Sequence, residues 1–100
     1  MDPAIPNIYI SDVVVSTAGR DQGSLYYVIS TDELFLMLVN GKDRTLDKPK
    51  RKKLRHVQKV LRSETRVAEK ISHGDKVLNS ELRRDLAYIA REMQANNLGG

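Results

Sequence analysis

Residues 13–29 read VVVSTAGRDQGSLYYVI and carry the clearest structural signal in the chain. The β-branched run 13–15 and the tyrosine-containing run 24–30 each have the composition of a strand. Between them, Gly19 and Gly23 permit the positive φ angles of a tight connection, and Asp21 suits an Asx turn. This stretch therefore predicts two short strands joined by a compact loop.

The run 34–39, LFLMLV, predicts a third strand that is apolar at every position. A strand with one solvent-facing side should instead alternate between apolar and polar residues. Both faces of this strand are therefore expected to be covered. One face would fill the interior of a small barrel, and the C-terminal part of the chain would cover the other.

Turn signals predict two further strands. Asn40-Gly41 is typical of a type I′ hairpin turn, so residues 43–47 should return along the third strand. Pro49 has no N–H to donate and should end that pairing, which leaves residues 54–57 as a candidate closing strand. Five short strands with tight turns within about 45 residues favour a small antiparallel barrel over an open sheet.

From residue 63 onward the apolar pattern becomes helical. Ser63 is a suitable N-cap, and His73-Gly74 is a suitable C-terminal stop. A second helix should begin at Asn79 or Ser80 and end near Asn96-Asn97, with an apolar stripe formed by Leu82, Leu86, Ile89, Ala90 and Met93. We interpret this stripe as packing on the outside of the barrel; a helix that binds a partner's groove is the alternative.

These patterns predict a single domain of mainly β structure with C-terminal α-helices. Its parts would be an N-terminal arm (1–9), a barrel (10–58) and a helical extension packed on the barrel (59–100). The chain contains no cysteine, which excludes disulfides and thiolate metal sites. Its longest apolar run has six residues, whereas a membrane span needs about 20. We therefore expect a cytoplasmic protein without a secretory signal.

Positive charge is concentrated in one part of the chain. Residues 42–70 contain 12 basic and 4 acidic residues, whereas the chain as a whole carries a net charge of only +4. The densest part, 48–56, reads KPKRKKLRH. Such a field suits a polyphosphate partner, because neutralised phosphates release condensed counterions. A solvated surface or a nuclear import signal are the alternatives.

Catalysis and metal binding have little support in the sequence. There is no cysteine nucleophile and no phosphate loop of the Gly-Lys-Ser type. His56 and His73 are 17 positions apart and lack an evident set of further ligands. We therefore expect neither an enzyme nor a cofactor or metal site.

The strand–loop–strand stretch 13–29 resembles a KOW motif, in which a Gly-basic-Asp-x-Gly loop joins two hydrophobic strands. The segments NGKDR (40–44), KPKRKK (48–53) and LRH (54–56) extend the match. Together they resemble the bacterial KOW-domain RNA-binding proteins, which are related to an archaeal and eukaryotic large-subunit ribosomal protein. The resemblance spans about residues 10–57. It implies an SH3-like barrel that contacts RNA on the ribosome; position 22, often basic in that family, is here Gln22.

The candidate RNA-binding residues combine the loop with the basic segment: Arg20, Gln22, Lys42, Arg44, Lys48, Lys50, Arg51, Lys52, Lys53 and Arg55. Gly19 and Gly23 are expected to shape the loop. Lysine is almost never buried unpaired, so residues 50–53 should all project into solvent or onto a partner.

Two individual expectations remain open to alternatives. Arg20 should contact a phosphate or an unpaired base, or else pair with Asp21 or another carboxylate. Tyr26 and Tyr27 should point to opposite faces, one into the core and the other available for base stacking. The competing function class is a protein-interaction module of the transcription or translation machinery, since SH3-like barrels also bind proteins.

Overall fold

The computed structural model describes the backbone of residues 7–99 and the side chains of residues 7–95. Most of the predicted N-terminal arm and Gly100 lie outside the described residues. The strands are β1 (Asp12–Ser16), β2 (Leu25–Thr31), β3 (Phe35–Val39), β4 (Lys50–Lys53) and β5 (Val57–Arg62). A 3-10 turn at Leu54–His56 joins β4 to β5, and the helices are α1 (Arg66–His73) and α2 (Asn79–Gly99).

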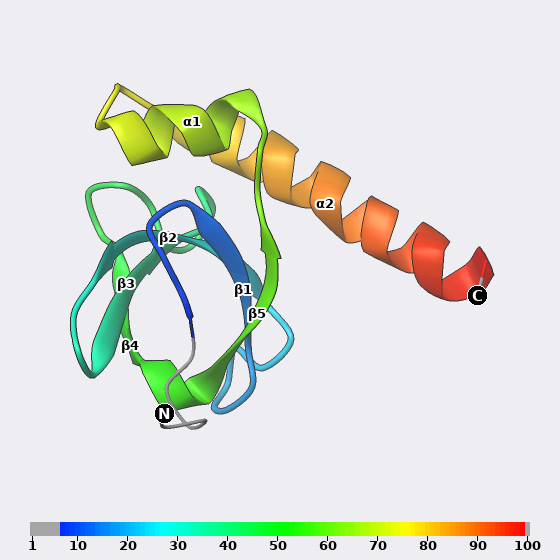
Figure 1. Cartoon of the computed structure of the whole chain (residues 1–100), viewed down its shortest axis with the longest axis horizontal. Coiled ribbons are helices and arrows are strands. Elements are labelled where there is room, and N and C mark those ends of the chain that lie inside the picture. Colours follow the sequence, from blue (N-terminus) through cyan, green and yellow to red (C-terminus); the bar gives the residue numbers. More distant parts are fainter. Residues whose placement is uncertain (1–6, 100) are drawn as a thin grey trace.

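The five strands form one antiparallel sheet in the order β4-β3-β2-β1-β5. The sheet is strongly curved, and α1 and α2 lie together on one side of it (Figure 1). Register shifts between Val13 and Val14 and between Val28 and Ser30 accompany this curvature. Such irregularities bend a strand and increase its twist. A mainly β domain with two C-terminal helices is thus confirmed.

The prediction for the segment after β3 was wrong. Residues 43–47 form turns, and the fourth strand is the basic run Lys50–Lys53 itself. Pro49 immediately precedes β4, a position where its missing N–H removes no ladder bond. The turn after β3 is not type I′, because Gly41 has a positive φ of 77° and Asn40 does not. Instead, the Asn40 side-chain oxygen accepts hydrogen bonds from the backbone N–H groups of Lys42 and Arg44.

The sheet is buried on both faces at its centre. Because side chains alternate along a strand, the neighbours Tyr26 and Tyr27 on β2 point to opposite faces. One face encloses an inner cluster of Ile8, Val14, Tyr26, Val28, Leu36, Leu38 and Val57. The other forms an outer cluster in which Val13, Tyr27 and Val39 pack with Val67, Ala68, Leu82, Leu86 and Ile89 of the helices. The predicted covering of the sheet by the apolar stripe of α2 is therefore confirmed.

The covering does not extend along the whole of β3, as had been expected. Leu34 is 68% exposed, and Phe35 and Met37 are only half-buried. Leu36 and Leu38 lie in the inner cluster, and Val39 is the β3 residue that joins the outer cluster. The unbroken apolar run therefore leaves an exposed apolar surface at the start of β3.

The helix ends follow local capping. Thr65, and not the predicted Ser63, caps α1, because its side-chain oxygen accepts from the N–H of Ala68 at 3.2 Å. Gly74 ends α1 in the left-handed conformation with φ 73°, as predicted. α2 begins at Asn79, also as predicted, and continues to Gly99, past the expected end at Asn96-Asn97.

A hydrogen-bond network under the helices connects them to the sheet. The Tyr27 hydroxyl donates to Asp85 of α2 and lies 2.8 Å from Ser63 Oγ and 3.2 Å from Thr65 Oγ1. Thr65 also donates to Asp85 at 2.8 Å. Burial and the bond to Asp85 raise the pKa of Tyr27 to about 12. Tyr26 is equally buried, so the expectation that one of the two tyrosines lies outside the core and is available for stacking was wrong.

Two glycines with positive φ allow a matched test of how the loop 40–44 docks on α2. A Cβ on Gly41 would lie 2.2 Å from the Asn79 backbone oxygen, whereas a Cβ on Gly23 would meet nothing within 4 Å. Gly23→Ala should therefore cost about 1 kcal/mol of unfolding free energy from backbone conformation alone. Gly41→Ala should cost at least about 3 kcal/mol. Urea unfolding curves measure both, and equal losses would show that the loop does not pack against α2.

Candidate nucleic-acid interface

β4 divides the basic run between two faces of the sheet. Across the β3–β4 ladder, Lys50 lies opposite Leu38 and Lys52 opposite Leu36, so both lysines share the inner face. The other two cations lie opposite the half-buried residues of β3. We call this second side the β3–β4 outer face; its residues are Phe35, Met37, Arg51 and Lys53.

Lys52 is buried, which corrects the expectation that all four cations of β4 project outward. It is only 8% exposed, and its Nζ lies 2.8 Å from Asp21 Oδ1 and 2.9 Å from the Ala18 carbonyl oxygen. Lys50 Nζ lies 3.5 Å from Asp21 Oδ2. A lysine tolerates burial when a carboxylate and a carbonyl satisfy its ammonium group, and both are present here.

Asp21 organises the loop between β1 and β2. Besides the lysines, its carboxylate accepts hydrogen bonds from Ser16 Oγ at 2.8 Å and from the Tyr26 hydroxyl at 2.7 Å. Burial alone would raise the pKa of Asp21, but the hydrogen bonds from Lys52, Tyr26 and Ser16 outweigh it and lower the pKa well below its usual range. The predicted Asx turn is therefore replaced by a side-chain hub that ties the loop to β4.

The β3–β4 outer face combines cations with exposed apolar groups. The Arg51 guanidinium lies 3.7 Å from the centroid of the Phe35 ring, a cation–π contact. Lys53 is exposed on the same face, and Leu34, which immediately precedes β3, is also exposed. Packing on the ring gives the Arg51 fork a defined position while it remains open to solvent.

Residues of the loop between β1 and β2 line a hollow beside β4. Arg20, Arg44 and Lys50 line this hollow of about 330 Å³, together with Asp21, Ser24, Tyr26 and Asp43. Among the described residues Arg20 forms no ion pair, because Asp21 is engaged by the lysines. The remaining candidates, Gln22, Lys42, Lys48 and Arg55, are exposed and do not line this hollow. Gly19 and Gly23 have φ angles of 86° and 93°, consistent with a shaping role.

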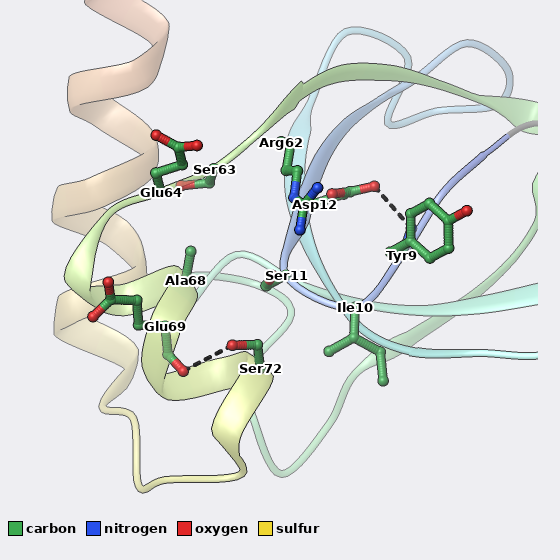
Figure 2. A pocket seen from close by; sticks show the side chains of 10 residues that line it. All are labelled: Tyr9, Ile10, Ser11, Asp12, Arg62, Ser63, Glu64, Ala68, Glu69 and Ser72. Atoms are coloured by element: carbon green, nitrogen blue, oxygen red, sulfur yellow. Dashed lines mark hydrogen bonds between the residues drawn. The ribbon is translucent and has the colours of Figure 1, made fainter.

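A different hollow, of about 700 Å³, lies between segment 9–12 and α1 (Figure 2). Its lining includes the exposed Glu64 and Glu69 and the exposed ring of Tyr9. The buried Asp12 carboxylate accepts from the Tyr9 N–H at 2.8 Å and lies 3.0 Å from Lys59 Nζ. The exposed Arg62 also lines this hollow, so its two exposed carboxylates leave a small excess of negative charge, which makes this side less favourable for phosphate groups.

No protein-family model matches this chain, and a search of curated proteins returned no match. No helix in the described part combines the length and apolar character needed to cross a membrane. Within residues 7–99 there is also no cluster of three or more His, Cys, Asp or Glu side chains placed to hold a metal ion. The surface chemistry of the molecule therefore carries the functional argument.

Substitution at adjacent positions of β4 tests the division between its faces. Lys52→Gln should lower the unfolding free energy by about 2–3 kcal/mol, because it leaves the buried Asp21 carboxylate without its closest cation. Lys53→Gln removes the same charge from the exposed face and should change stability by less than about 0.5 kcal/mol. Urea unfolding at neutral pH compares them, and equal stability would mean that Lys52 is not a structural residue.

The Asp21 hub also predicts a particular acid response. Its folded pKa is lowered, so its contribution is complete above the unfolded pKa of about 3.9 and is lost as pH falls through the folded value. The difference in unfolding free energy between wild type and Asp21→Asn should thus stay constant from about pH 8 to 5 and shrink below about pH 4. Denaturation midpoints at each pH give this difference, and a gap that is unchanged at pH 3 would contradict the assignment.

Proposed function

We propose that this protein binds RNA through β4, the loop between β1 and β2 and the segment around them. The observation that carries the proposal is the unpaired charge on this side. Among the described residues, ion pairs of segment 42–55 involve only Lys50 and Lys52. The exposed cations therefore remain free to neutralise phosphates: Lys42, Lys48, Arg51, Lys53 and Arg55.

The geometry favours structured RNA over an extended single strand on this surface. Both tyrosines of β2 are buried, and Arg51 covers one face of the half-buried Phe35 ring, so this surface offers little aromatic area for stacking. A curved strand and loops bearing separated cations suit recognition of backbone shape and phosphate spacing. Arg20 and Arg44 beside the hollow add planar forks for individual phosphates.

The KOW resemblance supports a more specific proposal, an SH3-like KOW barrel that binds ribosomal RNA in the cytoplasm. A strand, a Gly-Arg-Asp-x-Gly loop and a second strand occur in the order that the motif requires. Co-sedimentation with purified large ribosomal subunits tests this step. Binding that resists excess transfer RNA supports a ribosomal site, whereas complete competition would reduce the proposal to general RNA binding.

A protein partner is the second candidate, and the partly exposed apolar residues around the start of β3 favour it. Leu34 is 68% exposed, next to the half-buried Phe35 and Met37. Exposed apolar groups beside cations are typical of a protein interface. Affinity purification with and without ribonuclease separates the candidates, because loss of all partners after nuclease treatment supports RNA as the primary ligand.

Salt dependence gives a quantitative test of the RNA proposal. If about five phosphates are contacted, log affinity should fall with log salt with a slope near −3 to −5. Arg51→Gln/Lys53→Gln should reduce the magnitude of that slope by about 1.4–1.8, since each contact contributes about 0.7–0.9. Fluorescence anisotropy with a 30-nucleotide RNA hairpin at three or more salt concentrations measures it.

The matched control is Arg62→Gln/Lys76→Gln, which removes the same charge from exposed positions away from β4. Its slope should remain close to that of the wild type. Equal slopes for the two double variants would place the RNA contact outside the β3–β4 outer face.

A further inference from the structure

A third hollow, of about 580 Å³, lies between α1 and α2, and half of its eight lining residues are cations. Arg66 contributes from the first turn of α1, and Arg84, Tyr88 and Arg91 contribute from α2. The three α2 residues are spaced i, i+4 and i+7, so they share one face of the helix. α2 projects beyond β1 and β5, whereas β4 is at the other end of the sheet order, so this hollow is separate from the surface proposed above (Figure 1).

The two acids that line this hollow already have partners. Glu81 accepts from Lys70 Nζ at 2.8 Å and from the Leu78 N–H at 3.0 Å, and these bonds lower its pKa. Asp85 accepts the hydroxyl hydrogen bonds of Tyr27 and Thr65. Among the described residues no ion pair involves the three arginines of the hollow. The hollow therefore retains a net positive charge.

Helix stability does not explain these cations. Arg66 occupies the first position of α1, where the positive end of the helix dipole disfavours a cation. Arg84 lies in the N-terminal third of α2, where a cation again gains nothing from the dipole. An arginine fork that is free of carboxylates is suited to a phosphate group, which it can bind through two parallel hydrogen bonds.

Tyr88 adds an aromatic group beside the arginines. Its side chain is 51% exposed, although its neighbour Ile89 is buried in the outer cluster. Tyr88 also borders a smaller hollow of about 220 Å³, which is lined by the apolar Leu61, Ile89 and Met93 and has the exposed Glu64 and Glu92 at its margin. The ring thus borders both hollows, and both its apolar body and its hydroxyl are accessible to a ligand.

We propose that this hollow is a second RNA-contact site, which binds an unpaired nucleotide. Arg84 and Arg91, with Arg66 opposite them, would contact its phosphates, and Tyr88 would stack on its base. The inference rests on the proposed RNA binding and adds to it a preference for RNA with unpaired bases. Two contact sites on one RNA increase overall affinity, because the second contact forms intramolecularly.

Two probes and two pairs of variants test the site. The probes are a five-nucleotide single-stranded RNA, which offers unpaired bases, and a blunt RNA duplex, which offers only phosphates. Tyr88→Ala should weaken binding of the single strand at least about fivefold and change duplex binding less than about twofold, because only an unpaired base can stack. Tyr88→Phe keeps the ring and should bind like the wild type.

The second pair of variants tests the positive charge of the hollow. Arg84→Gln/Arg91→Gln should reduce the salt slope for the single strand by about 1.4, the value for two phosphate contacts. The control Arg62→Gln/Lys76→Gln removes equal charge elsewhere and should leave the slope unchanged. Melting temperatures verify that the variants are folded. An independent test needs no substitution: photocrosslinking of the wild type to a 5-bromouridine pentamer should label the peptide that contains Tyr88.

The outcomes distinguish this inference from the proposed function. If the wild type binds neither the single-stranded RNA nor the RNA duplex, both the proposed function and the second site are overturned. If it binds RNA and Arg51→Gln/Lys53→Gln weakens that binding while the α2 variants behave like their controls, the second site is overturned and the proposed function stands. If only the α2 variants lose affinity, the site stands and the β4 surface is overturned. A crosslink that maps away from α2 also overturns the site.

Discussion

Two consecutive buried tyrosines on β2 hold the molecule together. Because side chains alternate along a strand, Tyr26 and Tyr27 enter opposite faces of the sheet, and each donates its hydroxyl to a carboxylate. Tyr26 reaches Asp21, which fixes the loop and Lys52 of β4. Tyr27 reaches Asp85, which fixes α2. Neither hydroxyl can be buried without such an acceptor, so the positions of the loop and of α2 are set by one dipeptide.

Patterns with a strict period were read correctly from the sequence. The β-branched run at 13–15, the strand with two tyrosines and the helical stripe on α2 were each predicted with the correct type, and the stripe was also predicted with the correct face. Gly74 was predicted as the end of α1 because a left-handed residue after a helix is a local requirement. In these cases a few neighbouring residues determine the outcome, and the sequence shows all of them.

Features that depend on distant partners were missed. The basic run was taken for solvent-exposed surface, and nothing near it in sequence reveals that Asp21 provides a buried counter-charge for Lys52. Both Ser63 and the true cap of α1, Thr65, contact the Tyr27 hydroxyl, 36 and 38 positions away, and the sequence does not reveal these contacts. The basic hollow requires α1 and α2 to be adjacent, although the spacing of Arg84, Tyr88 and Arg91 on one helix face was a readable signal. Tertiary contacts decide these features, and local propensity does not.

The place of β4 at one end of the sheet order gives its cations a second consequence. A terminal strand presents unpaired N–H and C=O groups to which a strand of another molecule can add, and closely spaced lysines oppose such pairing by repulsion between copies. The charges of Arg51 and Lys53 are expected to oppose such pairing between copies, close to the exposed Leu34, whose apolar surface would favour association. An RNA bound as proposed would neutralise these charges and remove this protection, so the RNA itself would have to shield the strand edge.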